Sequence, residues 1–127
     1  MFLLGVVSCD DPDAAPPVSD DPTAFTGRVT RVVDGDTFWL DSRDVSIRVW
    51  GLDTPERDEA GWSEATAALT RMIAGEQLTC RERDIDRYDR IVGQCFRADG
   101  RDVAAAMINS GTAAEYCRYS GGAYGNC

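Results

Sequence analysis

The stretch TGRVTRVVDGDTFWLDSRDVSIRVWGL, residues 26–52, decides the fold that this sequence predicts. It is rich in β-branched and aromatic residues, which favour strands. Short polar breaks divide it into three such runs, at 26–33, 36–40 and 45–52. Both breaks have the composition of hairpin turns, Asp34-Gly35 in the first and Asp41-Ser42-Arg43-Asp44 in the second. These residues therefore predict a three-stranded antiparallel meander.

Four further elements are expected after the meander. Apolar spacing and capping residues predict a helix at about 63–74 with Ser63 as N-cap, strands at about 77–83 and 91–97, and a helix from Asp102 to Gly111. The resulting order is βββαββα. It predicts an α+β, mainly β, fold: a five-stranded OB-fold barrel with two covering helices.

Composition excludes several kinds of chemistry. The chain has 127 residues, enough for one modest domain, and it contains no histidine. Imidazole catalysis and histidine-bound zinc are therefore excluded. All 13 basic residues are Arg, whose planar guanidinium suits phosphate and carboxylate. The formal net charge of −9 argues against a polyanionic partner, but five of the 22 acids lie before residue 25, so the remainder is only mildly acidic.

The amino-terminal residues differ from the rest of the chain. In residues 1–9 an apolar run ends in Val-Val-Ser-Cys, which resembles the processing box of bacterial lipoproteins, whose cysteine, here Cys9, becomes lipidated. The end of a plain secretory signal and a chance tail are the alternatives. Residues 10–25, rich in Asp, Pro and Ala, are expected to form a tether before a domain at 26–127. We therefore expect an extracytoplasmic protein, either secreted, periplasmic or attached to a membrane through Cys9.

The cysteines favour disulfides over zinc. With Cys9 set aside, four cysteines are left, an even number, and no C-x-x-C pair exists. Of the three possible pairings, we favour Cys80–Cys95 across a hairpin and Cys117–Cys127 at the carboxyl end. Four buried free thiols are the alternative.

Carboxylates gather at two predicted strand ends. Asp34 and Asp36 lie in VDGDT, and Asp53 and Glu56 lie in GLDTPE. Carboxylates with backbone carbonyls and water form a hard-oxygen ligand set that suits Ca²⁺ or Mg²⁺. Each string by itself is also a common turn or capping loop.

Two groups of basic residues stand near these acids in the sequence. Arg48 interrupts an apolar strand and shares a face with Trp50, so it requires an anionic partner. That partner is either a bound anion or a structural ion pair with Asp36 or Asp53. The second group, on the charged connection between the last two strands, comprises Arg87, Tyr88 and Arg90, which also suit a solvated surface.

Taken in order, VDGDT, IRVWGLDTPE, DRYDR and GRDVAAAMINSGTAAEY resemble the motifs of the thermonuclease family, staphylococcal nuclease-like OB-fold phosphodiesterases. The resemblance covers about residues 26–120. It implies a monomeric, Ca²⁺-dependent endo- or exonuclease that acts on DNA or RNA, with single strands preferred. Water would attack the phosphodiester with the help of the metal, leaving 3′-phosphate and 5′-hydroxyl ends.

The resemblance also implies roles for individual residues. The metal ligands would be Asp36, Asp53 and the carbonyl oxygen of Thr54. The catalytic residues would be Arg48 and Arg90, which clamp the phosphate, and Glu56, which orients or deprotonates the attacking water. The substrate would be contacted by Arg87, Tyr88 and one or both of Tyr116 and Tyr119.

Three departures from the family pattern bear on activity. The longer basic loop that follows the Glu56 position in the family is missing, which predicts weaker polynucleotide binding. Asp89 replaces a usual Gly, which predicts either an ion pair with Arg90 or an unfavourable backbone conformation. Only eight residues follow Tyr119, so the third helix is expected to be absent or shortened. The alternative functions are a non-catalytic OB-fold module, binding single-stranded nucleic acid or another ligand, and an acidic surface protein.

Overall fold

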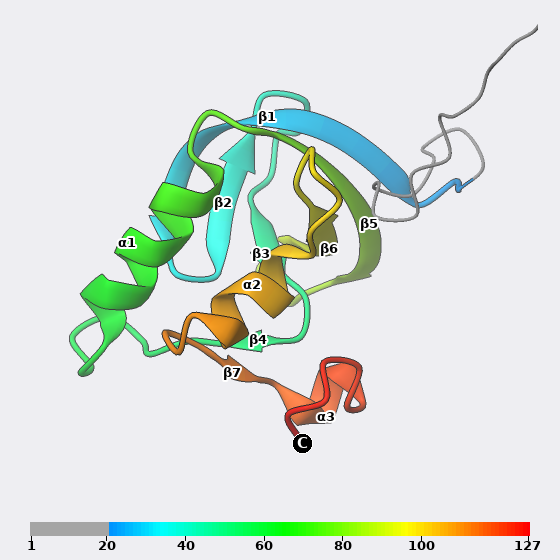
Figure 1. The fold of residues 1–127 in the computed structure, drawn as a ribbon. Helices are drawn as coiled ribbons and strands as arrows, with labels where there is room; N and C mark the ends of the chain where they lie inside the picture. Colours follow the sequence, from blue (N-terminus) through cyan, green and yellow to red (C-terminus); the bar gives the residue numbers. More distant parts are fainter. Residues whose placement is uncertain (1–20) are drawn as a thin grey trace, which may run out of the picture.

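The computed structural model describes residues 21–127, so that the signal or lipoprotein segment with Cys9 and most of the tether lie outside the described residues. Five strands form a closed barrel in the order β1-β2-β3-β6-β5 (Figure 1). Their bounds are β1 Ala24–Asp34, β2 Thr37–Leu40, β3 Ile47–Val49, β5 Gln77–Ile85 and β6 Ile91–Phe96. All neighbouring strands are antiparallel except β3 and β6, which are parallel. The predicted five-stranded OB-fold barrel is confirmed.

Two helices cover the barrel, as predicted. Helix α1 (Trp62–Ile73) buries Ala65, Ala68, Leu69 and Ile73, which recur at helical spacing. Helix α2 (Val103–Asn109) begins at the predicted cap, because the Asp102 side chain accepts a hydrogen bond from the backbone N–H of Ala105. The predicted Ser63 cap is wrong. Helix α1 begins one residue earlier, after Gly61 in a left-handed conformation (φ 91°), with no side-chain cap.

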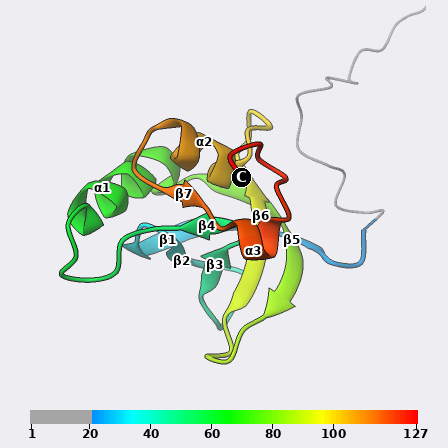
Figure 2. The same ribbon diagram turned by 90° about the horizontal axis from the view of Figure 1, so that it is seen from below.

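The predicted strand over 45–52 is divided in the structure. The chain bends at Gly51, whose φ of 78° is a left-handed value that glycine adopts readily. After the bend, β4 (Leu52–Asp53) leaves the barrel and pairs with β7 (Ala114–Glu115) in a separate two-stranded sheet. A single turn, α3 (Cys117–Ser120), follows β7 and is the expected shortened third helix (Figure 2).

The core fills the barrel and the space beneath the helices. Phe38, Ile47, Val49, Leu69 and Ile73 are fully buried there. Phe25 also belongs to this core, because β1 begins at Ala24, two residues before the expected start of the domain. No helix within residues 21–127 is long and apolar enough to cross a membrane.

Both favoured cysteine pairs are bonded in the structure. Cys80 and Cys95 lie opposite each other on β5 and β6, and their side chains are buried in the core. Cys117 and Cys127 join the start of α3 to the carboxyl end, and both are exposed. The two disulfides therefore differ in their access to solvent.

Candidate active site

Strand pairing brings the two candidate arginines to one place on the outer surface of the barrel. Ile47 and Val49 are fully buried, so the alternating Arg48 points away from the core. Arg48 is registered with Thr37 on β2 and with Val92 on β6. Arg90 precedes Val92 by two residues. It therefore reaches the same surface, although it lies far from Arg48 in the sequence.

A single carboxylate, that of Asp36, connects both arginines. Arg48 Nη2 lies 3.5 Å from Asp36 Oδ2, and both side chains are mostly buried. The Thr37 hydroxyl donates to Asp36 Oδ1 at 2.8 Å and accepts from Arg90 Nη1 at 3.3 Å. The Arg48–Asp36 ion pair that the sequence offered as one alternative is present, with a second guanidinium beside it.

The DTPE segment approaches this group from the other side. Arg48 Nη2 also donates to the carbonyl oxygen of Leu52 at 3.2 Å, and Asp53 is the next residue along β4. A Cβ placed on Gly35 would lie 3.3 Å from Thr54 Cγ2. The turn that carries Asp36 and the segment that carries Asp53 and Thr54 are therefore neighbours.

Asp86 fixes the orientation of Arg90. Its carboxylate accepts hydrogen bonds from the backbone N–H groups of Tyr88 and Arg90 and, at 2.7 Å, from Arg90 Nε. Burial opposes ionisation of Asp86, but these hydrogen bonds outweigh it and lower its pKa. Asp89 is not the ion-pair partner of Arg90; it adopts a left-handed backbone conformation with φ of 64°. Of the two effects expected from Asp89, the structure has the backbone effect.

Aromatic side chains stand beside both arginines. The Tyr88 ring centre is 5.4 Å from Arg90 Cζ, and its hydroxyl accepts a hydrogen bond from Arg87 at 2.9 Å. The ring centre of Tyr116 is 5.9 Å from Arg48 Cζ, and the Tyr119 ring meets Tyr116 edge-on with centroids 4.8 Å apart. Tyr88 and Tyr119 are 64% and 57% exposed, so both rings are available for a ligand to stack on.

The donor set fits a hard divalent cation. Burial, and secondly the adjacent Asp36 carboxylate, raise the pKa of Asp34 to about 6. In residues 21–127, only Glu115, Cys117 and Cys127 form a group of three possible metal ligands whose atoms lie within 4.8 Å of one another. The two cysteines of this group are bonded to each other in a disulfide. Neither Asp36 nor Asp53 belongs to such a group of three in residues 21–127.

Glu56 is the one predicted catalytic residue that the structure leaves apart. Its backbone N–H donates to the Glu59 carboxylate at 2.6 Å in a tight turn. Its own carboxylate is exposed and makes no hydrogen bond or ion pair with any residue that the structure describes.

Two residues of the site, Thr37 and Asp86, were not predicted from the sequence. Both lie inside quoted motifs, VDGDT and DRYDR, where their proximity to Asp36 and Arg90 was the available signal. Neither residue type indicates its partner by itself. Thr37 on β2 accepts a hydrogen bond from Arg90, which is distant in the sequence, and Asp86 accepts one from Arg90 across a loop.

The fold and the site together define an OB-fold barrel that carries two arginines and a cluster of carboxylates on its outer surface. Comparison with protein families matches residues 46–125 to the family described as staphylococcal nuclease homologue. The chain belongs to this family, whose nucleases are generally metal-dependent.

Curated relatives agree with this assignment. The chain is 41% identical over 98 residues to an uncharacterized endonuclease of Escherichia coli, covering 74% of this chain and 63% of the relative. It is 37% identical to a succinoglycan biosynthesis protein of Rhizobium meliloti (66% and 49% covered) and 28% identical to a micrococcal nuclease of Shigella flexneri (76% and 61%). The chain thus spans less than two thirds of the length of each of these relatives.

Proposed function

We propose that the protein is a Ca²⁺-dependent nuclease that hydrolyses phosphodiester bonds of DNA or RNA. The observation that carries this proposal is that Arg48 contacts Asp36 directly and Arg90 is linked to Asp36 through the Thr37 hydroxyl, beside the segment that holds Asp53. The names of the endonuclease and micrococcal nuclease relatives support the same activity.

The two arginines would bind the scissile phosphate. A guanidinium group donates paired hydrogen bonds to phosphate oxygens, and these bonds strengthen as negative charge grows in the transition state. Asp86 holds Arg90 through its Nε, and Nη1 of Arg90 is directed toward the Thr37 hydroxyl. In this proposal Arg48 neutralises the phosphate and Arg90 stabilises the leaving oxygen.

The acids would hold the cation and serve the attacking water. Asp36, Asp53 and the carbonyl of Thr54 are the proposed ligands. When bound, Ca²⁺ would supply positive charge next to the phosphate and a site for water. Glu56, exposed on its loop, would orient that water or accept its proton. Attack on phosphorus with departure of the 5′ oxygen leaves 3′-phosphate and 5′-hydroxyl ends.

The aromatic residues favour single-stranded substrate. Tyr88 with Arg87 lies beside Arg90, and Tyr116 with Tyr119 lies beside Arg48, so that stacking surfaces flank the phosphate position on two sides. Bases are free to stack on such surfaces when they are unpaired. We propose that a monomer binds the strand in this way.

We also propose that the protein acts outside the cytoplasm. Disulfides persist in oxidising compartments, and residues 21–127 contain two. An intact mass of the native product tests the proposed anchor, because a lipidated Cys9 adds the mass of its acyl groups and an unmodified Met1 start would contradict it.

Cleavage of fluorescent single-stranded DNA and RNA tests the proposed activity. We expect cleavage with Ca²⁺ that is abolished by EGTA, and a rate loss of about 100- to 1,000-fold for Arg48→Ala, the size reported for loss of one transition-state donor. Glu56→Gln should be similarly impaired. Arg31→Ala, which removes an exposed arginine of β1, is the matched control and should retain activity.

The same assay separates the alternatives. Cleavage that persists in EGTA and in both site variants would remove the proposal. Binding of the strand without cleavage would favour the non-catalytic OB-fold module instead.

A further inference from the structure

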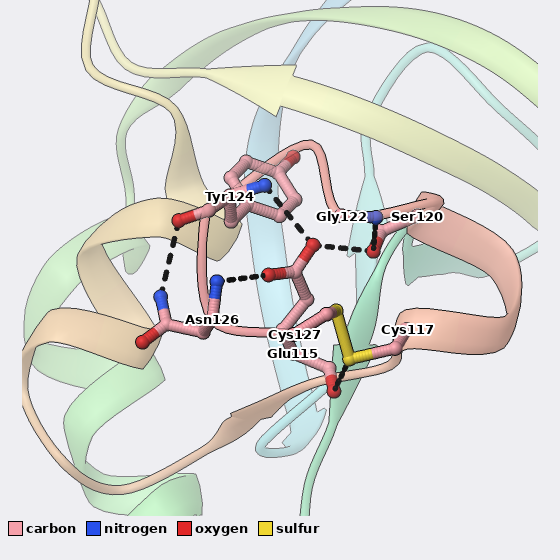
Figure 3. Close-up of a disulfide and its surroundings, with 7 residues drawn as sticks. All are labelled: Glu115, Cys117, Ser120, Gly122, Tyr124, Asn126 and Cys127. Atoms are coloured by element: carbon pink, nitrogen blue, oxygen red, sulfur yellow. Dashed lines mark hydrogen bonds between the residues drawn. A yellow bond between two sulfur atoms is a disulfide. The ribbon is translucent and has the colours of Figure 1, made fainter.

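The carboxylate of Glu115, which is outside the proposed catalytic group, binds three residues near the carboxyl end of the chain. Glu115 is buried, and its carboxylate accepts hydrogen bonds from the Ser120 hydroxyl, from the Tyr124 N–H at 3.0 Å and from the Asn126 N–H at 2.8 Å (Figure 3). Burial opposes ionisation of Glu115, but these three donors outweigh it and lower its pKa. We refer to residues 115–127 as the C-terminal clasp.

A disulfide closes the clasp on the outside. The Cys117–Cys127 bond joins residues ten positions apart, and both cysteines are exposed (Figure 3). Helix α3 is only four residues long, too short to be stable by itself. The shape of the clasp therefore depends on the disulfide, on Glu115 and on the Tyr124 hydroxyl, which donates to Asp102 at 2.8 Å.

The clasp is also the support of one side of the proposed active site. The Tyr116 N–H donates to the Gly51 carbonyl at 2.8 Å, and the Tyr124 ring lies so close to Gly51 that a Cβ there would be 2.9 Å from Cε2. Glu115 itself is paired with Leu52, whose carbonyl accepts from Arg48. The clasp thus determines where the Tyr116 ring stands relative to Arg48.

We propose that the C-terminal clasp positions the rings of Tyr116 and Tyr119, which form a substrate-binding wall beside Arg48, and that the Cys117–Cys127 disulfide is its reducible fastener. This inference rests on the proposed nuclease function. The groups that hold the clasp together, Glu115, Tyr124 and the Cys117–Cys127 disulfide, are not among the proposed catalytic or substrate-binding residues. Their loss should weaken substrate binding through the tyrosines while leaving the chemistry of bound substrate nearly unchanged.

The redox step requires an external dithiol. Its thiolate attacks one sulfur of the Cys117–Cys127 bond to form a mixed disulfide, and its second thiol then displaces that sulfur. Two electrons pass to the protein, which gains two thiols, and the dithiol becomes a cyclic disulfide. The buried Cys80–Cys95 bond is shielded from this reaction in the folded protein.

Mild reduction of the full chain tests the proposal without changing its sequence. After dithiothreitol treatment under native conditions and alkylation, mass spectrometry should find Cys117 and Cys127 modified and Cys80 and Cys95 unmodified. Affinity for fluorescein-labelled oligothymidylate in EGTA should then fall about fivefold, the size expected for loss of one stacking contact. KM should rise by a similar factor, with kcat changed less than twofold.

Two variants and one further measurement complete the test. The double variant Cys117→Ser with Cys127→Ser should reproduce the reduced protein and no longer respond to dithiothreitol, whereas Tyr124→Phe, which keeps the ring over Gly51, should lose less affinity. Amide hydrogen exchange at Tyr116 should accelerate on reduction, because its bond to Gly51 is released.

The outcomes distinguish the two proposals. If the opened protein keeps its affinity, its KM and its Tyr116 protection, the clasp is not a positioning element and the inference is overturned. If the oxidised protein binds oligothymidylate but never cleaves it, the proposed function fails, while the affinity and exchange measurements still decide whether the clasp positions the wall.

Discussion

Asp89 is held in a backbone conformation that its side chain disfavours. Its φ of 64° lies in the left-handed region, where a residue with a Cβ costs about 1–2 kcal/mol relative to a right-handed conformation. In this loop the Asp89 N–H donates to the Asp86 carbonyl at 3.0 Å, and the Asp86 side chain accepts a hydrogen bond from Arg90. The strained residue thus directly precedes Arg90, a proposed catalytic residue.

The first prediction concerns substitutions at Asp89. Asp89→Gly should be more stable than Asp89→Ala by about 1 kcal/mol, with the native protein between them, because glycine adopts the left-handed region freely and alanine does not. Urea unfolding measures the difference. Asp89→Gly should keep its nuclease activity, since Asp86 rather than Asp89 binds Arg90. An alanine variant as stable as the glycine variant would contradict the strain at this position.

The Thr37 hydroxyl links Asp36 to Arg90 by two hydrogen bonds, and its removal is the second prediction. Thr37→Val keeps the shape of the buried side chain but leaves both partners without the hydroxyl, at a cost of about 1–3 kcal/mol. We expect kcat/KM for single-stranded DNA to fall about tenfold or more. Thr30→Val, on the exposed side of β1, is the matched control and should retain activity. Equal activity of the two variants would show that the bridge has no role.

At the scale of elements, the bend at Gly51 connects the barrel to the β4–β7 sheet. Gly51 and Gly75 have similar left-handed φ values of 78° and 72°, but their surroundings differ. A Cβ on Gly51 would meet Tyr124, whereas a Cβ on Gly75 would meet nothing within 4 Å. A substitution at Gly75 therefore introduces backbone strain alone, whereas the same substitution at Gly51 adds a steric collision with the C-terminal clasp.

Alanine substitution at these two glycines is the third prediction. Gly75→Ala should lower the free energy of unfolding by about 1–2 kcal/mol through strain alone. Gly51→Ala should lower the free energy of unfolding by about 1–3 kcal/mol more than Gly75→Ala does, because the new methyl group collides with Tyr124 of the clasp. Thermal and urea unfolding measure both values. Equal losses would mean that Tyr124 moves aside without resistance.

The bend also shows what the sequence was able to predict and what it was not. Alternation predicted β3, because Ile47 and Val49 are buried for reasons local to the strand. It did not predict that the strand ends before Gly51, because β4 is fixed by its pairing with β7, more than sixty residues away. Likewise, the motifs indicated Arg48 and Arg90, while the role of Glu115 depends on a chain fold that no local pattern encodes.

At the scale of the whole molecule, the two disulfides report on different events. The Cys80–Cys95 bond crosslinks β5 and β6 inside the barrel, so it is exposed only when the barrel opens. The Cys117–Cys127 bond lies at the surface and is exposed already in the folded state. Their rates of reduction therefore distinguish global unfolding from the local opening of the clasp.

The fourth prediction is that urea separates these two rates. Because Cys80 and Cys95 are at most 1% exposed, a dithiol reaches them only through unfolding of the barrel. The rate of their reduction should rise with urea with the slope of global unfolding, since the surface exposed determines that slope. Reduction of Cys117–Cys127 should be nearly independent of urea at low concentrations. Timed alkylation with mass spectrometry follows both bonds in one sample, and Arg31→Ala serves as a control that alters neither. Similar urea dependences for the two bonds would mean that the clasp and the barrel open together, as one cooperative unit.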